Sequence, residues 1–383
     1  MPPAAVHAEL WTAGQRRAAA IHEISYRACF KPQLPAYFIE RHSKVGDLVY
    51  DPFSGRGTTA IEAALLGRKV LANDVNPLSA RLAAPRLTVP TLADVEARLA
   101  EIPRTARVPK TPDLSMFFER KTLREILGLR QWLSTRRAAG TADAVDEWIG
   151  MVATNRLTGH SAGFFSVYSF PPNQAVSAQR QLRINAEREQ APSYRDTHAL
   201  ILKKTRALLQ GMDKAALRRL RAAGTSARFL TGDARHTAEI ASGSVALTVT
   251  SPPFLDVVDY AGDNWLRGWF NSLPVAKIAA AITVPRTVPQ WSAVMSEVLQ
   301  ELHRITKPGG VVAFEVGEVK KGAIKLDEVV VPLGIAAGFA CEAVLINAQR
   351  FTKTANIWGV ANNTGGTNSN RIVVFRKRKK IRR

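Results

Sequence analysis

A glycine-rich turn lies at the end of a short apolar run, residues 48–53. The turn reads DPFSGRGTT from Asp51 to Thr59, and Gly55 and Gly57 let the backbone bend sharply and approach a ligand. The helix expected after it offers unpaired backbone N–H groups in its first turn. The chain contains no GxxxxGK(S/T) phosphate loop, and it matches the three-glycine dinucleotide pattern only through Ala60. We therefore predict a nucleoside site outside the carboxyl end of this strand.

An acidic residue follows the glycines at a spacing that suits a ribose. Asp74 ends the next apolar run, residues 69–74, seventeen residues after Gly57. A carboxylate at the end of a second strand can accept hydrogen bonds from both ribose hydroxyls. Asp74 or the nearby Asn76 could instead cap the following helix, and both interpretations stay open at this point.

Apolar runs that alternate with helical patterns predict the elements that position these residues. Seven runs indicate strands, at residues 48–53, 69–74, 226–234, 245–254, 309–317, 341–351 and 370–377. Helices alternate with the strands up to the last pair. The predicted fold class is therefore α/β, with a Rossmann-like seven-stranded sheet.

The residues between the two groups of strands, 85–225, have a different composition. They contain Arg-rich helical patterns, and residues 114–230 hold 19 basic against 9 acidic side chains. We predict an inserted, mainly helical lobe that faces a polyanion. Its segment 163–174, GFFSVYSFPPNQ, ends in Asn173 and Gln174, amides of the kind that read base edges. Packing of this segment against the helices of the lobe is the equally open alternative.

The charge of the whole chain indicates a polyanionic partner. Lys and Arg number 53 against 32 Asp and Glu, a net charge of +21, and the tail 376–383 carries seven of the basic residues. Basic groups that neutralise phosphates release condensed counterions, although a basic surface can also serve solubility alone. No apolar run of about 18 residues occurs, and the first residues lack a signal-peptide pattern. We expect a soluble, cytoplasmic protein without membrane contact.

Two segments together resemble motifs of the DNA amino-methyltransferases, the N4-cytosine/N6-adenine family. DPFSGRGTT is similar to their motif I, and Ser251-Pro252-Pro253-Phe254 is similar to their catalytic motif IV. Taken alone, the second segment predicts only a rigid turn after a strand. The resemblance implies S-adenosyl-L-methionine as the cofactor and these four residues as the catalytic set, with Phe254 stacking on an extruded base. Serine at the first position of motif IV favours cytosine N4 over adenine N6.

Further segments fit the same family. Lys31-Pro32 lies at the distance expected of motif X, and Asp233-Ala234 ends the third strand, where an acid meets the adenine amine in this family. The motif order resembles the alpha arrangement, except that the insert precedes the third strand. The cofactor-binding residues that we predict are Lys31, Pro32, Asp51, Phe53, Gly55, Gly57, Thr58, Thr59, Asp74, Asn76, Asp233 and Ala234.

The segment after motif IV supplies polar and aromatic groups near the expected base pocket. We predict DNA contacts from Tyr260, Asn264 and Arg267, beside Asn173 and Gln174 of the lobe. An amphipathic core helix explains Trp265, Trp269 and Phe270 equally well. The resulting division of the chain is a methyltransferase core at 1–84 and 226–375, a recognition lobe at 85–225 and a basic tail at 376–383.

The leading hypothesis is a site-specific N4-cytosine methyltransferase that acts on double-stranded DNA by direct transfer after base flipping. The alternatives are an N6-adenine DNA enzyme, an RNA base methyltransferase and a catalytically silent DNA-binding protein. A C5-cytosine enzyme is disfavoured because that chemistry uses a Pro-Cys nucleophile, whereas both cysteines, Cys29 and Cys341, follow alanines. Two cysteines also favour no metal site. We expect a nucleoid-associated prokaryotic or phage protein. A cognate restriction endonuclease is a candidate partner, and the oligomeric state stays open.

Overall fold

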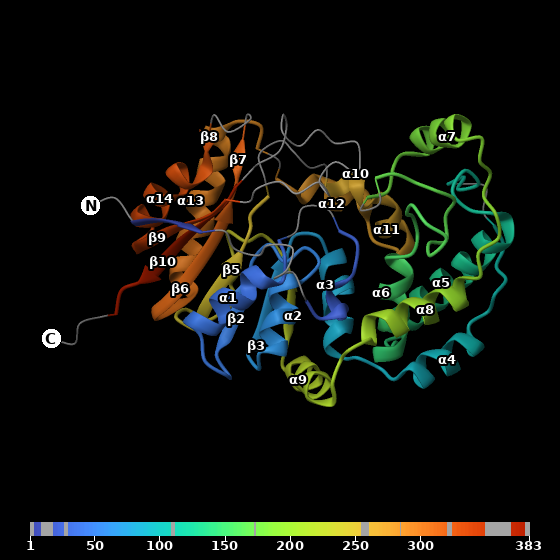
Figure 1. Ribbon diagram of the computed structural model, residues 1–383, viewed down its shortest axis with the longest axis horizontal. Helices are drawn as coiled ribbons and strands as arrows, with labels where there is room; N and C mark the ends of the chain where they lie inside the picture. Colours follow the sequence, from blue (N-terminus) through green and yellow to red (C-terminus); the bar gives the residue numbers. More distant parts are fainter. Residues whose placement is uncertain are drawn as a thin grey trace.

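A mixed eight-stranded sheet lies in the left half of the molecule as drawn in Figure 1, and the right half is helical. The computed structural model describes residues 4–8, 18–26, 30–108, 112–171, 174–253, 260–283, 285–319, 324–348 and 369–379. In spatial order the strands are β1 (Ala4–Ala8), β9 (Phe339–Ala348), β10 (Ser369–Lys377), β6 (Thr306–Val316), β5 (Val245–Thr250), β2 (Leu48–Asp51), β3 (Lys69–Asp74) and β4 (Arg228–Thr231). Strand β10 runs antiparallel between β6 and β9, and the other neighbours are parallel.

Both faces of the sheet are covered. Successive residues of its central strands point to opposite faces and belong to two different apolar cores. In β2, Val49 belongs to a core with helices α1 (Gln33–His42) and α2 (Thr58–Leu65). The next residue, Tyr50, belongs to a core with α13 (Val288–Ile305) and α14 (Leu326–Ala336). Strands buried on both sides read as continuous apolar runs, which is why these strands could be found in the sequence.

The chain changes direction across the sheet between β2 and β5. From β2 it proceeds to β3 and β4 on one side. From β5 it proceeds to β6 and then to β9 on the other side, and β10 finally enters between β6 and β9. Strands β2 and β5 are parallel neighbours with Val49 opposite Leu247, so their carboxyl ends lie together. The glycine-rich turn and the Pro-Pro segment, which are about 200 residues apart in the sequence, therefore flank one crevice.

The predicted α/β fold is confirmed, and the seven predicted strands are all present. The eighth strand, β1, was not predicted and pairs in parallel with β9 at the edge of the sheet. A separate two-stranded ribbon is formed by β7 (Glu318–Val319) and β8 (Ile324–Lys325). Two short 3-10 helices, η2 (Ala20–His22) and η3 (Ala84–Leu87), lie near the first part of the core.

Helices occupy the chain between β3 and β4, as predicted. After α3 (Leu78–Ala83) come α4 (Leu92–Glu101), α5 (Arg120–Ala138), α6 (Ala144–Thr154), α7 (Ala178–Glu187), α8 (Thr197–Leu209) and α9 (Lys214–Gly224). Helices α4 to α8 form a lobe at one end of the molecule, whereas α9 packs beside α2 and β3 (Figure 1). The short helices α10 (Tyr260–Asp263), α11 (Trp265–Phe270) and α12 (Val275–Ala281) follow β5. The lobe and the α2 face of the sheet share one apolar core.

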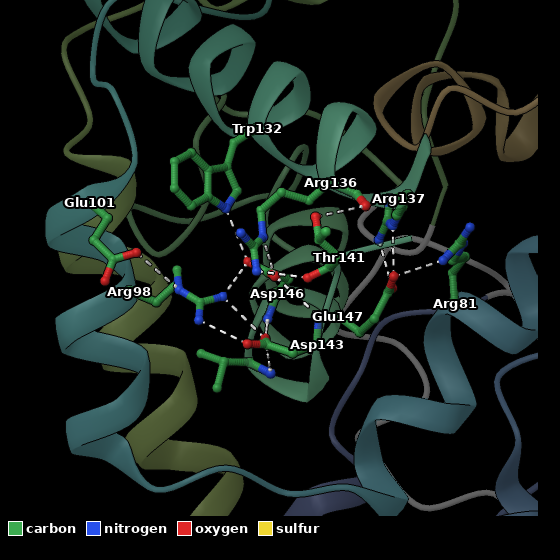
Figure 2. Close-up of polar contacts among 11 residues, drawn as sticks. Arg81, Arg98, Glu101, Trp132, Arg136, Arg137, Thr141, Asp143, Asp146 and Glu147 are labelled. Atoms are coloured by element: carbon green, nitrogen blue, oxygen red, sulfur yellow. Dashed lines mark hydrogen bonds and ion pairs between the residues drawn. The ribbon is translucent and has the colours of Figure 1, made fainter. Parts of the chain in front are cut away.

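Several arginines of the lobe serve its internal structure (Figure 2). The fully buried carboxylate of Asp146 in α6 pairs with Arg98 of α4 and Arg136 of α5, at 2.7 Å each. The neighbouring Glu147 pairs with Arg137 of α5 at 2.8 Å and with Arg81 of α3 at 2.9 Å. Ion pairs with a buried, hydrogen-bonded carboxylate hold elements in one arrangement. Part of the positive charge of the lobe is thus neutralised within the protein.

The basic tail begins later than its composition indicates. Arg376 and Lys377 are the last residues of β10. The Arg376 guanidinium donates to the Gly309 carbonyl at 2.9 Å, and Lys377 Nζ donates to the His303 carbonyl at 2.6 Å. These two cations therefore belong to the sheet. Within the described residues, every helix is too short or too polar to cross a membrane.

Candidate functional site

A pocket opens at the crevice where β2 and β5 end. Its walls come from the turn after β2, the ends of β3 and β4, the turn after β5, and helices α12 and α13. It contains about 960 Å³ of space, including the part open to solvent. The structure therefore places the predicted nucleoside-binding turn and the predicted catalytic turn on one cavity.

The turn from β2 into α2 brings its backbone close to the pocket. Gly55 lines the pocket with φ +50°, and Gly57 has φ +80°. A Cβ atom on Gly57 would lie 2.4 Å from the Cβ of Ala83, so a side chain cannot be accommodated there without movement. Both glycines thus occupy positions that disfavour other residues.

Asp51, Thr58 and Thr59 are buried beneath the turn and do not line the pocket. Thr250 Oγ1 donates to Asp51 Oδ1 at 2.6 Å, and Thr59 Oγ1 donates to the Val249 carbonyl at 3.0 Å. These bonds join the turn to β5. Burial raises the pKa of Asp51 to about 7, although the hydrogen bond from Thr250 opposes this. Direct cofactor contacts from these three residues stay predictions.

Asp74 lines the pocket and also holds the glycine turn. Its Oδ2 accepts from the Gly55 N–H at 2.8 Å, and its Oδ1 accepts from the Asn76 N–H at 2.9 Å. Burial raises its pKa to about 6, against the effect of these two bonds. Asn76 Oδ1 accepts from the Leu78 N–H at 3.0 Å, at the start of α3. The first backbone N–H of α3 therefore bonds to Asn76 and not to Asp74, and the N-cap position itself is Pro77.

The end of β4 contributes Asp233 and Ala234 to the pocket, and their contacts with a cofactor stay predictions. Arg235, which was not predicted, also lines it and pairs with Asp233 at 2.6 Å. This hydrogen bond, together with the positive charge of Arg235, lowers the pKa of Asp233. Phe53 and Asn76 line the same cavity, whereas Lys31, Pro32 and Gly57 do not. Tyr26, five residues before Lys31, forms part of the wall instead.

The turn after β5 brings Ser251 and Pro253 to the pocket, with Pro252 buried behind them. The Pro253 carbonyl accepts from Trp291 Nε1 of α13 at 3.1 Å. Trp291 is buried, so it fixes the direction of this backbone segment. Phe254 lies outside the described residues. Sequence reasoning missed Trp291 because only the packing of α13 brings it here.

A buried acid on the neighbouring strand, Glu315, was also missed. Thr250 of β5 lies opposite Phe314 of β6, and this register places Ser251 beside Glu315. The Glu315 carboxyl is hydrogen-bonded to the side chains of Ser251 and Asn370. Burial raises the pKa of Glu315 to about 7, although these hydrogen bonds oppose the shift. Its signal in the sequence was a single acid within the apolar run 309–317.

The residues predicted to contact DNA lie in different surroundings. Asn264 and Arg267 are buried, and Arg267 Nη1 donates to Asn264 Oδ1 at 2.8 Å. Helix α11 packs against the lobe, where Trp265 Nε1 donates to the Val176 carbonyl at 3.1 Å. This packing favours the core-helix interpretation of the α11 aromatic residues. Asn173 lies outside the described residues, and DNA contacts from Gln174, Tyr260, Asn264 and Arg267 stay predictions.

The described residues contain no group of three or more His, Cys, Asp or Glu side chains arranged as metal ligands.

Residues 5–84 match the DNA methylase family. This segment contains the motif X region, the glycine-rich turn and Asp74, and the match confirms the resemblance to DNA amino-methyltransferases. Over 74 residues the chain is 36% identical to the type II methyltransferase M.MjaII of Methanocaldococcus jannaschii. That alignment covers 19% of this chain and 14% of M.MjaII, so the chain spans about one seventh of that protein.

Two solved structures with which the chain aligns have low sequence identity to it. TrmN from Thermus thermophilus aligns with 94% of this chain and 52% of its own at 15% identity, with a TM-score of 0.36. TTHA0409 from the same organism, described as a DNA modification methylase and solved with S-adenosyl-L-methionine, is 22% identical. It aligns with 40% of this chain and 56% of its own, with a TM-score of 0.24. These low TM-scores support no residue-level comparison.

Proposed function

We propose that this protein is a DNA methyltransferase that uses S-adenosyl-L-methionine to methylate the N4 amine of cytosine. The observation that carries the proposal is the single pocket that joins Gly55 and Asp74 to Ser251 and Pro253. A nucleoside-binding turn and a target-amine turn on one cavity allow two reactants to be held in contact, which accounts for much of the rate of a direct transfer.

The residues around Asp74 suit the cofactor. A carboxylate has about four acceptor positions, and Asp74 uses one on each oxygen for backbone N–H groups. The remaining positions can accept the two hydroxyls of a ribose. Asp233 and Phe53 of the same pocket are proposed to contact the adenosine. When bound, the cofactor supplies an electrophilic methyl group on sulfur.

Ser251 and the Pro-Pro backbone are proposed to orient the target amine. The Ser251 side chain is hydrogen-bonded to Glu315, and when its hydroxyl donates to that carboxylate, its oxygen faces the amine as an acceptor. The Trp291 bond holds Pro253 in a fixed direction. An exocyclic amine held by acceptors can keep its lone pair directed at the methyl group. Glu315 is buried and does not line the pocket, so the proton that the methylated nitrogen loses would reach it through Ser251, whose hydroxyl takes up that proton and passes its own to the carboxylate.

Serine as the first residue of the SPPF segment favours cytosine over adenine. The helical lobe, residues 85–225, is proposed to recognise the target sequence in double-stranded DNA. Base flipping is proposed because the exocyclic amine must reach a pocket beside the sheet. A cognate restriction endonuclease would cleave the same sequence that this chain methylates. A methylome identifies the methylated sequence, and a cleavage assay on unmethylated DNA tests for the endonuclease.

Product analysis tests the proposal directly. The purified chain is incubated with S-adenosyl-L-methionine and unmethylated DNA or RNA, and the digested nucleosides are identified by mass spectrometry. We expect N4-methylcytosine from DNA, and strong loss of product for Ser251→Ala with retained cofactor affinity. N6-methyladenine or a methylated ribonucleoside would establish the corresponding alternative. Cofactor binding without any product would favour the silent DNA-binding protein.

A further inference from the structure

Three cationic side chains meet where the lobe adjoins the core. Arg156 follows the end of α6, Lys204 lies in α8 and Arg267 lies in α11. At the end of α11, Asn271 Nδ2 donates to Thr154 Oγ1 of α6 at 2.8 Å. This bond brings α11 against the segment that carries Arg156, and α8 packs on α6 (Figure 1).

Arg156 is half-buried and forms no ion pair with any carboxylate in the part of the chain that the structure describes. Its Nε donates to the Asn155 carbonyl at 2.9 Å, and its Cζ lies 4.1 Å from the centroid of the Phe164 ring. Its two terminal nitrogens make no hydrogen bond with described residues, yet they are not enclosed. The guanidinium is therefore held in place while its terminal donors remain available to a ligand.

Burial and neighbouring positive charges destabilise the charged form of Arg156, and a bound anion would offset this. Burial, and then the charge of Arg267, lower the pKa of Arg156 to about 10. Burial, and then the charge of Arg156, lower the pKa of Lys204. Among the described residues, Lys204 Nζ pairs with Glu23 Oε2 at 3.7 Å, and the Glu23 side chain is 67% exposed. Arg156 therefore lies in a partly desolvated place with two further cations around it, where a bound anion is favoured.

The cluster is connected to the pocket through Tyr26, although none of its three residues lines the pocket. Arg267 is close enough to Tyr26 and Asp263 to interact electrostatically with both. Tyr26 lines the pocket, and its ring is 3.4 Å from the position that a Cβ on Gly55 would take. An anion at Arg156 would therefore lie on the side of the lobe, with Arg267 between it and the Tyr26 wall of the pocket.

We propose that Arg156, supported by Arg267 and Lys204, binds one backbone phosphate of the DNA strand whose target base enters the pocket. This inference rests on the proposed function. Phosphate oxygens accept paired hydrogen bonds from a guanidinium fork. A phosphate contact beside an extruded nucleotide sets the register of the strand without reading its sequence.

The test compares Arg156→Gln and Arg156→Lys with the wild-type protein. A matched control is Arg219→Gln, because Arg219 is exposed on α9, away from this cluster. Affinity for a fluorescein-labelled DNA duplex is measured by anisotropy over a series of salt concentrations. For Arg156→Gln we expect about tenfold to a hundredfold weaker binding and a salt slope smaller by about 0.9. Arg156→Lys should keep the slope and lose part of the affinity, because lysine keeps the charge but not the fork.

Duplexes that carry one neutral methylphosphonate each can locate the phosphate. At one position near the methylated base, the substitution should weaken binding by the wild-type protein and leave binding by Arg156→Gln unchanged. The inference is overturned if Arg156→Gln retains wild-type affinity and salt slope, or if every methylphosphonate affects both proteins equally. Binding of S-adenosylhomocysteine, measured in parallel, should not change in Arg156→Gln. A wild-type protein that neither binds nor methylates DNA would instead overturn the proposed function, and this inference with it.

Discussion

Asp74 offers the sharpest test of the cofactor site, because its ionisation falls within an accessible pH range. Burial raises its pKa to about 6. Ribose hydroxyls donate hydrogen bonds, so they bind the ionised carboxylate in preference to the protonated one. If only the ionised form binds, linkage predicts an affinity at pH 5 that is roughly elevenfold lower than at pH 8.

The substitution Asp74→Asn should remove this pH dependence. It should also weaken binding at about pH 8 by one to two decades, the cost of a lost charge-assisted hydrogen bond. Asp233→Asn is a matched control in the same pocket. The hydrogen bond with Arg235 is the main cause that lowers the pKa of Asp233, so Asp233 stays ionised throughout this pH range. The Asp233→Asn substitution should therefore leave the pH dependence of cofactor affinity unchanged.

Calorimetric titration with S-adenosylhomocysteine between about pH 5 and pH 8 gives the affinities, and circular dichroism confirms that each variant is folded. The quantity to compare is the difference between wild type and Asp74→Asn at each pH. This comparison cancels contributions from Asp51, whose pKa of about 7 lies nearby. A folded Asp74→Asn protein with the wild-type profile would remove Asp74 from the ligand site.

Three further outcomes are expected. Gly57→Ala should lower the free energy of unfolding by roughly 2–4 kcal/mol, because φ at Gly57 is +80° and Ala83 occupies the place of a Cβ atom. Gly140 has φ +69° and open space around it, so the control Gly140→Ala should lower the free energy of unfolding by only about 1 kcal/mol. Denaturant titrations measure both values. Burial raises the pKa of Glu315 to about 7, so the fold favours the protonated carboxyl. The stability that Glu315 contributes is fully present below its unfolded-state pKa and is lost as the pH rises through 7. Glu315→Gln should therefore stabilise the fold at about pH 8, by up to about 3 kcal/mol, and not at pH 4; equal effects at both would contradict the assignment. Deleting residues 378–383 should weaken binding to all DNA, with a salt slope smaller by about 0.9 for each phosphate that the tail neutralises, and a changed methylation site would refute a non-specific role for the tail.

Local patterns were sufficient to predict the central strands and the glycine-rich turn. A strand buried on both faces must be apolar throughout, and a turn with φ above zero needs glycine, so both leave a mark in consecutive residues. Asp74 could be found for the same reason, since it ends an apolar run at a fixed distance from Gly57. Strand β1 had no such mark, because Ala4–Ala8 is short and rich in alanine and its pairing depends on β9.

The amino-acid sequence by itself determined which segments are buried, where the backbone turns and which side chains are available for chemistry. Only the tertiary structure decided which of those side chains meet. Glu315 reaches Ser251 through the register of two parallel strands, and Arg156 meets Arg267 through the packing of α11 on α6. These pairs lie about 60 to 110 residues apart in the sequence. Local periodicity records whether a residue is buried, whereas contacts at such separations depend on strand order and helix packing, which the whole chain determines together.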